Sequence, residues 1–480
     1  MSLGRAGLLG PLTPFALELG LGALLLIVFV GGLVARGDDR RALAWLATLG
    51  VLALGVLSAF AHPVGPALGG MFVQDGLALF AKRLFLTATF IGLLAGLSLP
   101  DRAFARRAGE YHLLILGSLL GMFILASARD LILLFLAFEL MSIPLYVLTG
   151  FLKRDAGAVE ASLKFFLVGS VSSAVMAYGL SFVYGATGTT DLAKVAEVAA
   201  GAGPLLTLGL VATLVGFAFK IAAFPFHMWV PDTYEAASTP FVAWLSVTPK
   251  AAGFVAIFRV YFEGAGEHAA AWVPVAALLA TMTMLAGNLM ALPQQNTKRL
   301  LAYSGIAQIG YMLVGVAAAS ASGTAMVLFY LVAYVFANMG AFLVVEALVR
   351  AEGSEATTAF RGLAQRSPLL ALAMLLFLLS LGGIPFVAGF WAKLYVFWAA
   401  TERGLYWLVL LGAILTVVAL FYYLLVAKRM YIEAPERSSR VPVAPTLALS
   451  VLLCALGVVL LGLYPKPIVM AAMRVASPLF

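Results

Sequence analysis

Four ionisable side chains stand inside long apolar stretches of this 480-residue sequence. They are Glu139, Lys220, Lys250 and Lys393, in the stretches LFLAFELMSIPLY, GFAFKIAAFPFH, WLSVTPKAAGFV and VAGFWAKLYVF. A charge at the depth of a lipid bilayer costs about 2.5–3.5 kcal/mol or more, so such residues usually face a protein interior and mark an ion or proton path. The residue types therefore point to proton or ion movement.

A proline lies near each of these four residues, at Pro144, Pro225, Pro249 and Pro385. A proline inside a helix lacks a donor and leaves the carbonyl four residues earlier without a partner. In lipid such a carbonyl must be satisfied, so broken helices persist only where they are buried in protein or line water. Ionisable groups beside helix breaks indicate the interior of a transporter.

Glu139 and Lys220 are expected to interact with each other. A buried carboxyl group alone would stay protonated, whereas beside a lysine it would ionise. At ~4 Å and an effective dielectric constant near 20, such a pair is worth about 4 kcal/mol. Moving one charge across 100 mV costs about 2.3 kcal/mol. Forming or breaking this pair is therefore large enough to respond to a membrane potential.

Lys250 follows Pro249 at the centre of an apolar stretch, too deep for its stem to reach either surface, and we expect it to load and release a proton. Lys393 lies after a predicted helix break and closer to one membrane surface. His227 also follows a break, where it could relay protons between Lys220 and Lys250 or could equally be a structural group.

Several further polar residues have less specific interpretations. Water between the charged groups could be held by Tyr303, Ser304 and Asn338, although helix packing explains these residues about as well. Charges near the ends of spans are expected to extend towards the membrane surface, namely Lys82, Arg83, Arg259 and Glu346. Lys164 is expected to do the same, or else to support Glu139.

The composition indicates a polytopic helical membrane protein. Hydrophobic residues make up 63% of the chain and charged residues 11%, whereas ordinary soluble chains have about 25% charged residues. The net charge of +8 comes from dispersed basic residues, which argues against nucleic-acid binding. The single cysteine excludes an internal disulfide and a cysteine-ligated cluster, and the four histidines lack metal-ligand spacing.

Windows long enough to cross ~30 Å of hydrocarbon predict fourteen spans. Their approximate limits are 15–35, 42–61, 72–99, 111–128, 131–151, 158–184, 204–230, 239–262, 271–292, 298–319, 323–350, 368–400, 405–431 and 442–464. Most lysines and arginines of the loops follow odd-numbered spans, which predicts that these loops are cytoplasmic and that both termini lie outside.

The seventh and twelfth spans are expected to be broken, at AAFPFH (222–227) and LGGIPF (381–386). Because the breaks are five spans apart, the sequence predicts two five-helix repeats inserted upside down relative to each other. The predicted segments are an N-terminal three-helix segment (1–110), two inverted repeats (111–262 and 263–431) and a C-terminal helix (432–480).

The longer motifs resemble the proton-pumping, antiporter-like membrane subunits of respiratory complex I, the NADH–quinone oxidoreductase, and among these the N type. The similar segments are FELMSIPLYVLTGF, FKIAAFPFHMWVPDTYEAASTP, LSVTPKAAGF, NTKRLLAYSGIAQIGYMLVG and GGIPFVAGFWAKLYVF. The resemblance implies that Glu139, Lys220, Lys250 and Lys393 form a central proton-transfer axis. YEAASTP and GGIPF depart from the usual family pattern, which affects the expected geometry of the breaks.

The resemblance also implies a translocase subunit of a bacterial inner membrane that works with other membrane-arm subunits. NADH, FMN, iron–sulfur clusters and quinone are then expected in partner subunits and none of them in this chain. Two alternatives share this ancestry: a subunit of a multisubunit sodium/proton antiporter, and a subunit of a membrane-bound hydrogenase or formate-oxidising complex.

Overall fold

The computed structural model describes residues 10–35, 39–98, 104, 107–437 and 439–480. In this part of the chain, thirteen helices are long and apolar enough to cross a membrane, which confirms the expected helical membrane fold. Parts of two predicted segments lie outside the described residues. They are 1–9, 36–38, 99–103, 105 and 106 in the N-terminal segment, and position 438 in the C-terminal segment.

The first half of the chain contains the following elements. They are α1 (Ala16–Val34), α2 (Asp39–Phe60), β1 (Gly65–Ala67), β2 (Phe72–Gln74), α3 (Gly76–Gly96), α5 (Ala108–Ser127), α6 (Leu131–Thr149), α7 (Ala156–Thr187), α8 (Leu192–Ala199), α9 (Pro204–Ile221), α10 (Trp229–Ala236), α11 (Thr239–Leu245), α12 (Thr248–Ile257) and the π-helical segment η3 (Phe258–Gly264).

The second half is built from longer helices and one interrupted pair. They are α13 (Ala269–Ala291), α14 (Thr297–Ala317), α15 (Ala321–Glu352), α16 (Leu363–Arg366), α17 (Pro368–Gly382), α18 (Ala388–Glu402), α19 (Tyr406–Tyr431), α20 (Pro445–Leu463) and α21 (Lys466–Ala476). Short 3₁₀ turns occur at Gly10–Phe15, Leu68–Gly70, Gly266–His268, Thr357–Phe360 and Ser477–Leu479.

The count of long spans differs from the fourteen expected because residues 368–400 form two shorter helices, α17 and α18. α17 ends at Gly382 because Gly383 adopts a left-handed conformation with φ of 82°. α9 likewise ends at Ile221, where Ala222 has φ of 67°. Helices therefore end at both positions where the sequence predicts breaks.

A short antiparallel hairpin forms the one β-sheet in the described residues. β1 pairs with β2, and Pro66 lies opposite Val73. The third predicted span, 72–99, was therefore placed too early, since its first three residues form β2 and the helix begins at Gly76. The Asp75 side chain accepts a hydrogen bond from the Ala78 amide and so caps the helix start.

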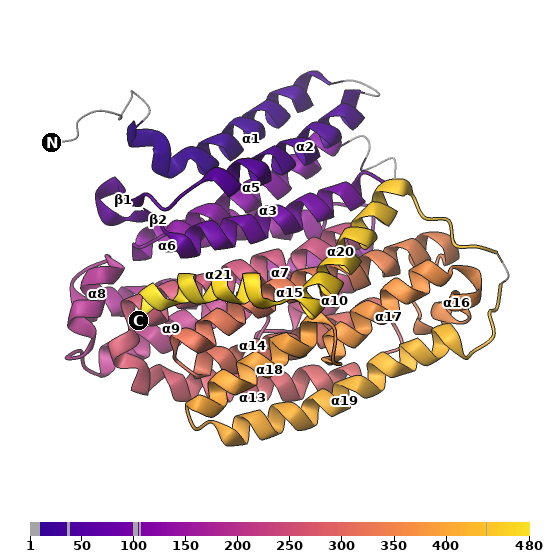
Figure 1. The fold of residues 1–480 in the computed structure, drawn as a ribbon. Helices are drawn as coiled ribbons and strands as arrows, with labels where there is room; N and C mark the ends of the chain where they lie inside the picture. Colours follow the sequence, from indigo (N-terminus) through magenta and orange to yellow (C-terminus); the bar gives the residue numbers. More distant parts are fainter. Residues whose placement is uncertain (1–9, 36–38, 99–103, 105–106, 438) are drawn as a thin grey trace.

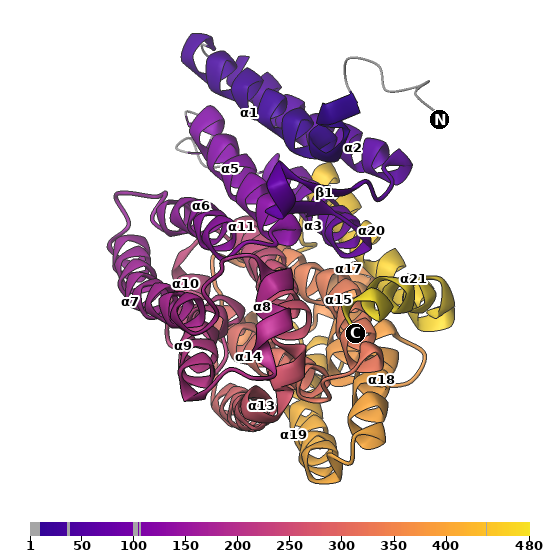
Figure 2. The same cartoon turned by 90° about the vertical axis from the view of Figure 1, so that its left-hand side faces the viewer.

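The helices lie side by side in one elongated bundle (Figure 1). α1 and α2 form one edge and α19 lies at the opposite edge, while α8 and the C-terminus lie at the same end of the bundle. Seen from that end, α14 and α15 lie in the interior between α7 and α18 (Figure 2). The segment Thr239–Gly264, α14 and α15 are almost wholly buried. These central helices carry Lys250 and much of the polar interior.

Candidate functional site

Lys220 lies in the last turn of α9, directly before the first helix break. Its side chain is 2% exposed, and its Nζ donates a hydrogen bond of 2.6 Å to the Ser142 hydroxyl on α6. That hydroxyl donates in turn to the Phe138 carbonyl at 2.5 Å. The ammonium also lies 4.9 Å from the centroid of the Phe138 ring, a geometry that stabilises a cation through the ring quadrupole.

Glu139 lies three residues before Ser142 on α6 and is partly buried. It is near enough to Lys220 to act on it electrostatically. Among the ion pairs of the described residues, however, none joins Glu139 to Lys220, and the buried Glu139 Oε1 has no hydrogen-bond partner there. Lys220 and Glu139 lie in the same region, but the hydrogen bond that Lys220 donates is accepted by Ser142.

Lys250 lies in the first turn of α12, which begins with Thr248 and Pro249. It is 1% exposed, and its Nζ lies 5.6 Å from the centroid of the Tyr234 ring. Within the described part of the chain this ammonium has no hydrogen-bond partner. The N-terminal end of a helix is an unfavourable place for a cation. The position of Lys250 therefore gives its charged form little stabilisation from the described residues.

Lys393 reaches back across the second break from α18. Its Nζ donates to the Gly382 carbonyl at 3.3 Å and lies 4.4 Å from the centroid of the Tyr311 ring. The last carbonyls of α17 have no partners within the helix and carry partial negative charge, so the lysine satisfies one of them. A side chain at Gly383 would come within 3.0 Å of the Lys393 Cδ. Glycine there provides both the backbone conformation and the room for the lysine.

His227 is buried in the break after α9, with its ring 5.3 Å from the Phe224 ring. It lines a cavity of about 470 Å³ together with Asp232, Arg299 and Tyr303. Its Nδ1 has no partner among the described residues, and no hydrogen bond described there joins it to Lys220 or Lys250. The structure thus places His227 beside a cavity at the first break.

An ion-pair cluster lies next to this cavity. Asp232 pairs with Lys164 and with Arg299, both at 2.9 Å, and Arg299 also pairs with Glu235 at 2.7 Å. Burial opposes ionisation of Asp232, but hydrogen bonds from Lys164 and Arg299 hold its pKa below the usual value. Lys164 also pairs with the exposed Glu160, and its own side chain is 48% exposed, as expected for a lysine that extends towards the surface. Through Asp232 it links α7 to α10.

Three of the four charges expected to extend to the membrane surface are buried instead. Lys82 is fully buried and pairs with Glu18 at 2.5 Å, and Arg259 is fully buried between Asp75 and Glu263. Glu346 is also buried and pairs with Arg350. For Lys82 and Arg259, the prediction of a surface position was wrong because their partners Glu18 and Asp75 come from distant parts of the sequence. Arg83 is exposed, as expected, and donates to the Ser58 and Ala61 carbonyls.

The polar residues Ser304 and Asn338 have protein partners. Ser304 shares a hydrogen bond of 2.5 Å with the Tyr423 hydroxyl, and Asn338 donates to Ser246 at 2.7 Å.

Three polar residues of the interior were not identified from the sequence, namely Ser142, Gln308 and Tyr423. For Ser142, a signal exists in the sequence, since its three-residue spacing from Glu139 places both on one helix face.

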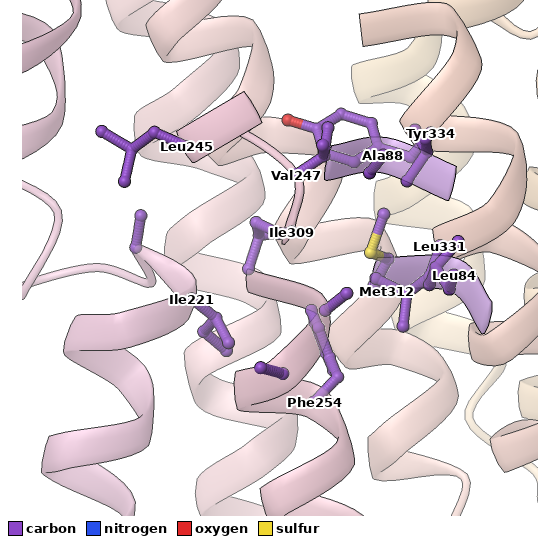
Figure 3. Close-up of a cluster of buried hydrophobic side chains, with 14 of the residues drawn as sticks. Leu84, Ala88, Ile221, Leu245, Val247, Phe254, Ile309, Met312, Leu331 and Tyr334 are labelled. Atoms are coloured by element: carbon purple, nitrogen blue, oxygen red, sulfur yellow. The ribbon is translucent and has the colours of Figure 1, made fainter. Parts of the chain in front are cut away.

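Apolar packing surrounds the polar groups of the interior. Figure 3 shows side chains of α3, α9, α12, α14 and α15 gathered in one cluster, with Tyr334 among them. Such a surrounding excludes bulk water and strengthens electrostatic interactions. Among the described residues, no group of three His, Cys, Asp or Glu side chains could hold a metal ion.

Comparison with known proteins gives concordant results. A family model described as "NADH:quinone oxidoreductase/Mrp antiporter, TM" matches residues 128–419. The sequence is 43% identical to NADH-quinone oxidoreductase subunit N of Moorella thermoacetica, over 96% of each chain. It is 42% identical to a subunit N of Rhizobium meliloti, over 92% of this chain and 93% of the relative. A chain of respiratory complex I from Thermus thermophilus is 33% identical and has a TM-score of 0.83, covering 95% of this chain and 99% of its own length.

Proposed function

Because the chain belongs to the subunit N family of NADH-quinone oxidoreductase, the antiporter-like, proton-pumping subunits of the membrane arm, we propose that Glu139, Lys220, Lys250 and Lys393 carry its proton. The observation that supports this most directly is the burial of three lysines, each 1–4% exposed, in a protein interior of apolar helices. None of the three has a carboxylate partner within 4 Å among the described residues. Charges this costly to bury are retained where they move ions.

The first pair acts as the switch. Lys220 alternates between Ser142, its partner in this structure, and the nearby Glu139. When Lys220 turns towards Glu139, the pair forms and the local positive charge seen by Lys250 falls. Lys250 is then loaded from the cytoplasmic side, and when the pair separates its proton passes to Lys393 and outward. The transfer from Lys250 to Lys393 moves one proton from an ammonium to an amine and no electron.

His227 is proposed to act at the cytoplasmic end of this path rather than between the two lysines. Its unpartnered Nδ1 and the cavity it shares with Asp232 and Tyr303 support a position where protons enter. Arg299 and Tyr303 are the residues of α14 that line this cavity.

The breaks after Ile221 and Gly382 support two inverted five-helix repeats over 111–262 and 263–431, following the N-terminal segment 1–110 and followed by the C-terminal segment 432–480. We assign α17 and α18 together as one crossing, the twelfth in chain order, which brings the total to fourteen. The loop charges support cytoplasmic odd loops, with both termini on the outer side of a bacterial inner membrane.

Redox chemistry is assigned to other subunits. NADH, FMN, the iron–sulfur clusters and quinone would be bound by partner chains. The free energy released by their redox reactions would reach this chain through the membrane arm. The two alternatives, a sodium/proton antiporter subunit and a hydrogenase subunit, are less well supported, because relatives about 40% identical over nearly the whole chain are named subunit N.

The test is proton pumping by the assembled complex. Lys220→Ala or Glu139→Ala should abolish or strongly reduce protons pumped per NADH while the complex still assembles. Glu160→Gln, an exposed carboxylate on α7, is the matched control and should pump normally. Pumping at the normal ratio by assembled Lys220→Ala and Glu139→Ala complexes would refute the assignment.

A further inference from the structure

An apolar groove of about 770 Å³ lies between α17 and α20, on the surface of the bundle. Leucine, valine and alanine side chains line most of its length, and two of these leucines, Leu372 and Leu452, are 57% and 53% exposed. The four residues assigned to the proton path do not line this groove. At membrane depth, apolar walls of this kind are covered by lipid chains or by another helix.

Two arginines lie at one end of the groove, each just before the start of a helix. Arg366 is the last residue of α16 and is 6% exposed, whereas Arg440 is exposed and precedes α20, which begins at Pro445. The Arg366 Nε donates to the Ser439 carbonyl at 2.9 Å, which holds the segment that carries Arg440 beside it. Among the described residues that line the groove, none is acidic. The groove is therefore apolar along its length and basic at one end.

The positive charge at this end is only partly compensated. Glu352 pairs with Arg366 and also with Arg437, the latter at 3.3 Å. Arg440 forms no ion pair or hydrogen bond in the part of the chain that the structure describes. Three arginines thus share one carboxylate, which leaves a positive charge that an anionic group would balance. A molecule that suits both features has an anionic head and an apolar tail.

We propose that the groove binds one anionic phospholipid, whose phosphate lies at Arg366 and Arg440 and whose acyl chain lies between α17 and α20. In the orientation proposed above, these arginines are on the cytoplasmic side, where anionic lipids give the leaflet a negative surface potential that attracts basic residues. The inference rests on the proposed function only for this choice of leaflet. A helix of a neighbouring subunit is less well suited, because apolar packing alone would leave Arg440 without a counter-charge.

The test uses the complete complex in lipid nanodiscs and measures lipid contact instead of pumping, so its outcome is independent of the proton path. Two photoactivatable probes are compared, phosphatidylglycerol and phosphatidylcholine, which carry the same diazirine on the same acyl chain and differ in net charge. After illumination, mass spectrometry gives the label on α17 and α20 relative to the total label on the complex. Phosphatidylglycerol should label these helices about fivefold more, which is what one basic residue contributes near an anionic surface. Equal labelling by the two probes would overturn the proposal.

Arg440→Gln should remove this preference, so that both probes label α17 and α20 equally. Because Arg440 is exposed and unpaired among the described residues, the variant complex should still assemble. Arg154→Gln is the matched control, since it removes an exposed arginine from the loop after α6, on the same proposed membrane side and away from the groove. This control should keep the fivefold preference. Retention of the preference by Arg440→Gln, or its equal loss in both variants, would refute the assignment of Arg440.

The apolar part of the groove is tested separately. Ala448→Phe places a ring in the groove and should lower the label on α17 from both probes. Leu449→Phe changes the next residue of α20, which does not line the groove, and should leave that label unchanged. Equal labelling of α17 in these two variants would contradict the position of the acyl chain. If neither probe labels α17 or α20 in the wild type while both label other helices, a neighbouring subunit covers the groove and the proposal is wrong.

Discussion

Lys220 donates its hydrogen bond to Ser142 and not to Glu139, although both acceptors lie on the same face of α6. The lysine is therefore held one helical turn from the carboxylate that would neutralise it, and Glu139 keeps a buried oxygen without a partner among the described residues. In the mechanism proposed above, this arrangement corresponds to the separated form of the pair.

Ser142→Ala should bias Lys220 towards Glu139, because it removes the competing acceptor. We expect protons pumped per NADH to fall about tenfold, since a hydrogen bond to a charged group contributes about 1.5–3 kcal/mol. Ser172→Ala is the control, as it removes a buried hydroxyl that only bonds its own helix at 2.8 Å. Equal pumping by the two variants would show that Ser142 does not hold the switch.

Gly383→Ala should weaken both the second break and the position of Lys393. The left-handed backbone at φ of 82° costs a non-glycine residue about 1 kcal/mol or more, and the new methyl group would meet the Lys393 Cδ at 3.0 Å. Gly404→Ala carries the same backbone penalty, at φ of 74°, with nothing near its methyl group. Thermal unfolding and pumping are measured for both. Only Gly383→Ala should lose pumping, and equal losses would contradict this account of Lys393.

The breaks and the ionisable residues could be predicted because their signals are local. Lys220 and Lys393 each stand near a proline within an apolar stretch, and the helices do end beside them, at Ile221 and Gly382. Among the described residues only thirteen helices are long enough to cross singly, because the predicted twelfth span is divided into α17 and α18, with 15 residues each.

The partners of the buried charges could not be predicted, since they come from helices far apart in the sequence. Its position along its own helix predicts that Lys82 reaches the surface, but Glu18 on α1 pairs with it in the interior. Tyr423 likewise meets Ser304 only because α19 packs near α14. Hydropathy gives the depth of a residue along its own helix and not which neighbour it faces.

The buried Lys82–Glu18 pair should be more important for stability than any surface pair. Glu18→Gln would leave a fully buried ammonium without its counter-charge, which costs about 3–5 kcal/mol. Glu160→Gln breaks an exposed pair with Lys164 and should cost less than about 1 kcal/mol. Lys82→Met combined with Glu18→Gln should recover most of the loss. Thermal unfolding of the purified complex tests this, and a Glu18→Gln variant as stable as Glu160→Gln would contradict it.

Asp232 should make the stability of the α7–α10 contact depend on pH. Its pKa is lowered in the folded protein by Lys164 and Arg299, so its contribution is fully present above the unfolded value of about 3.9 and is lost as pH falls through the lower folded value. Between about pH 5 and pH 3, the melting temperature of the wild type should therefore fall more steeply than that of Asp232→Asn, which has no carboxyl group to titrate. Asp155→Asn is the control, because that exposed aspartate caps α7 without an ion pair among the described residues. Parallel pH profiles for the wild type and Asp232→Asn would show that the ion pairs of Asp232 do not stabilise this contact.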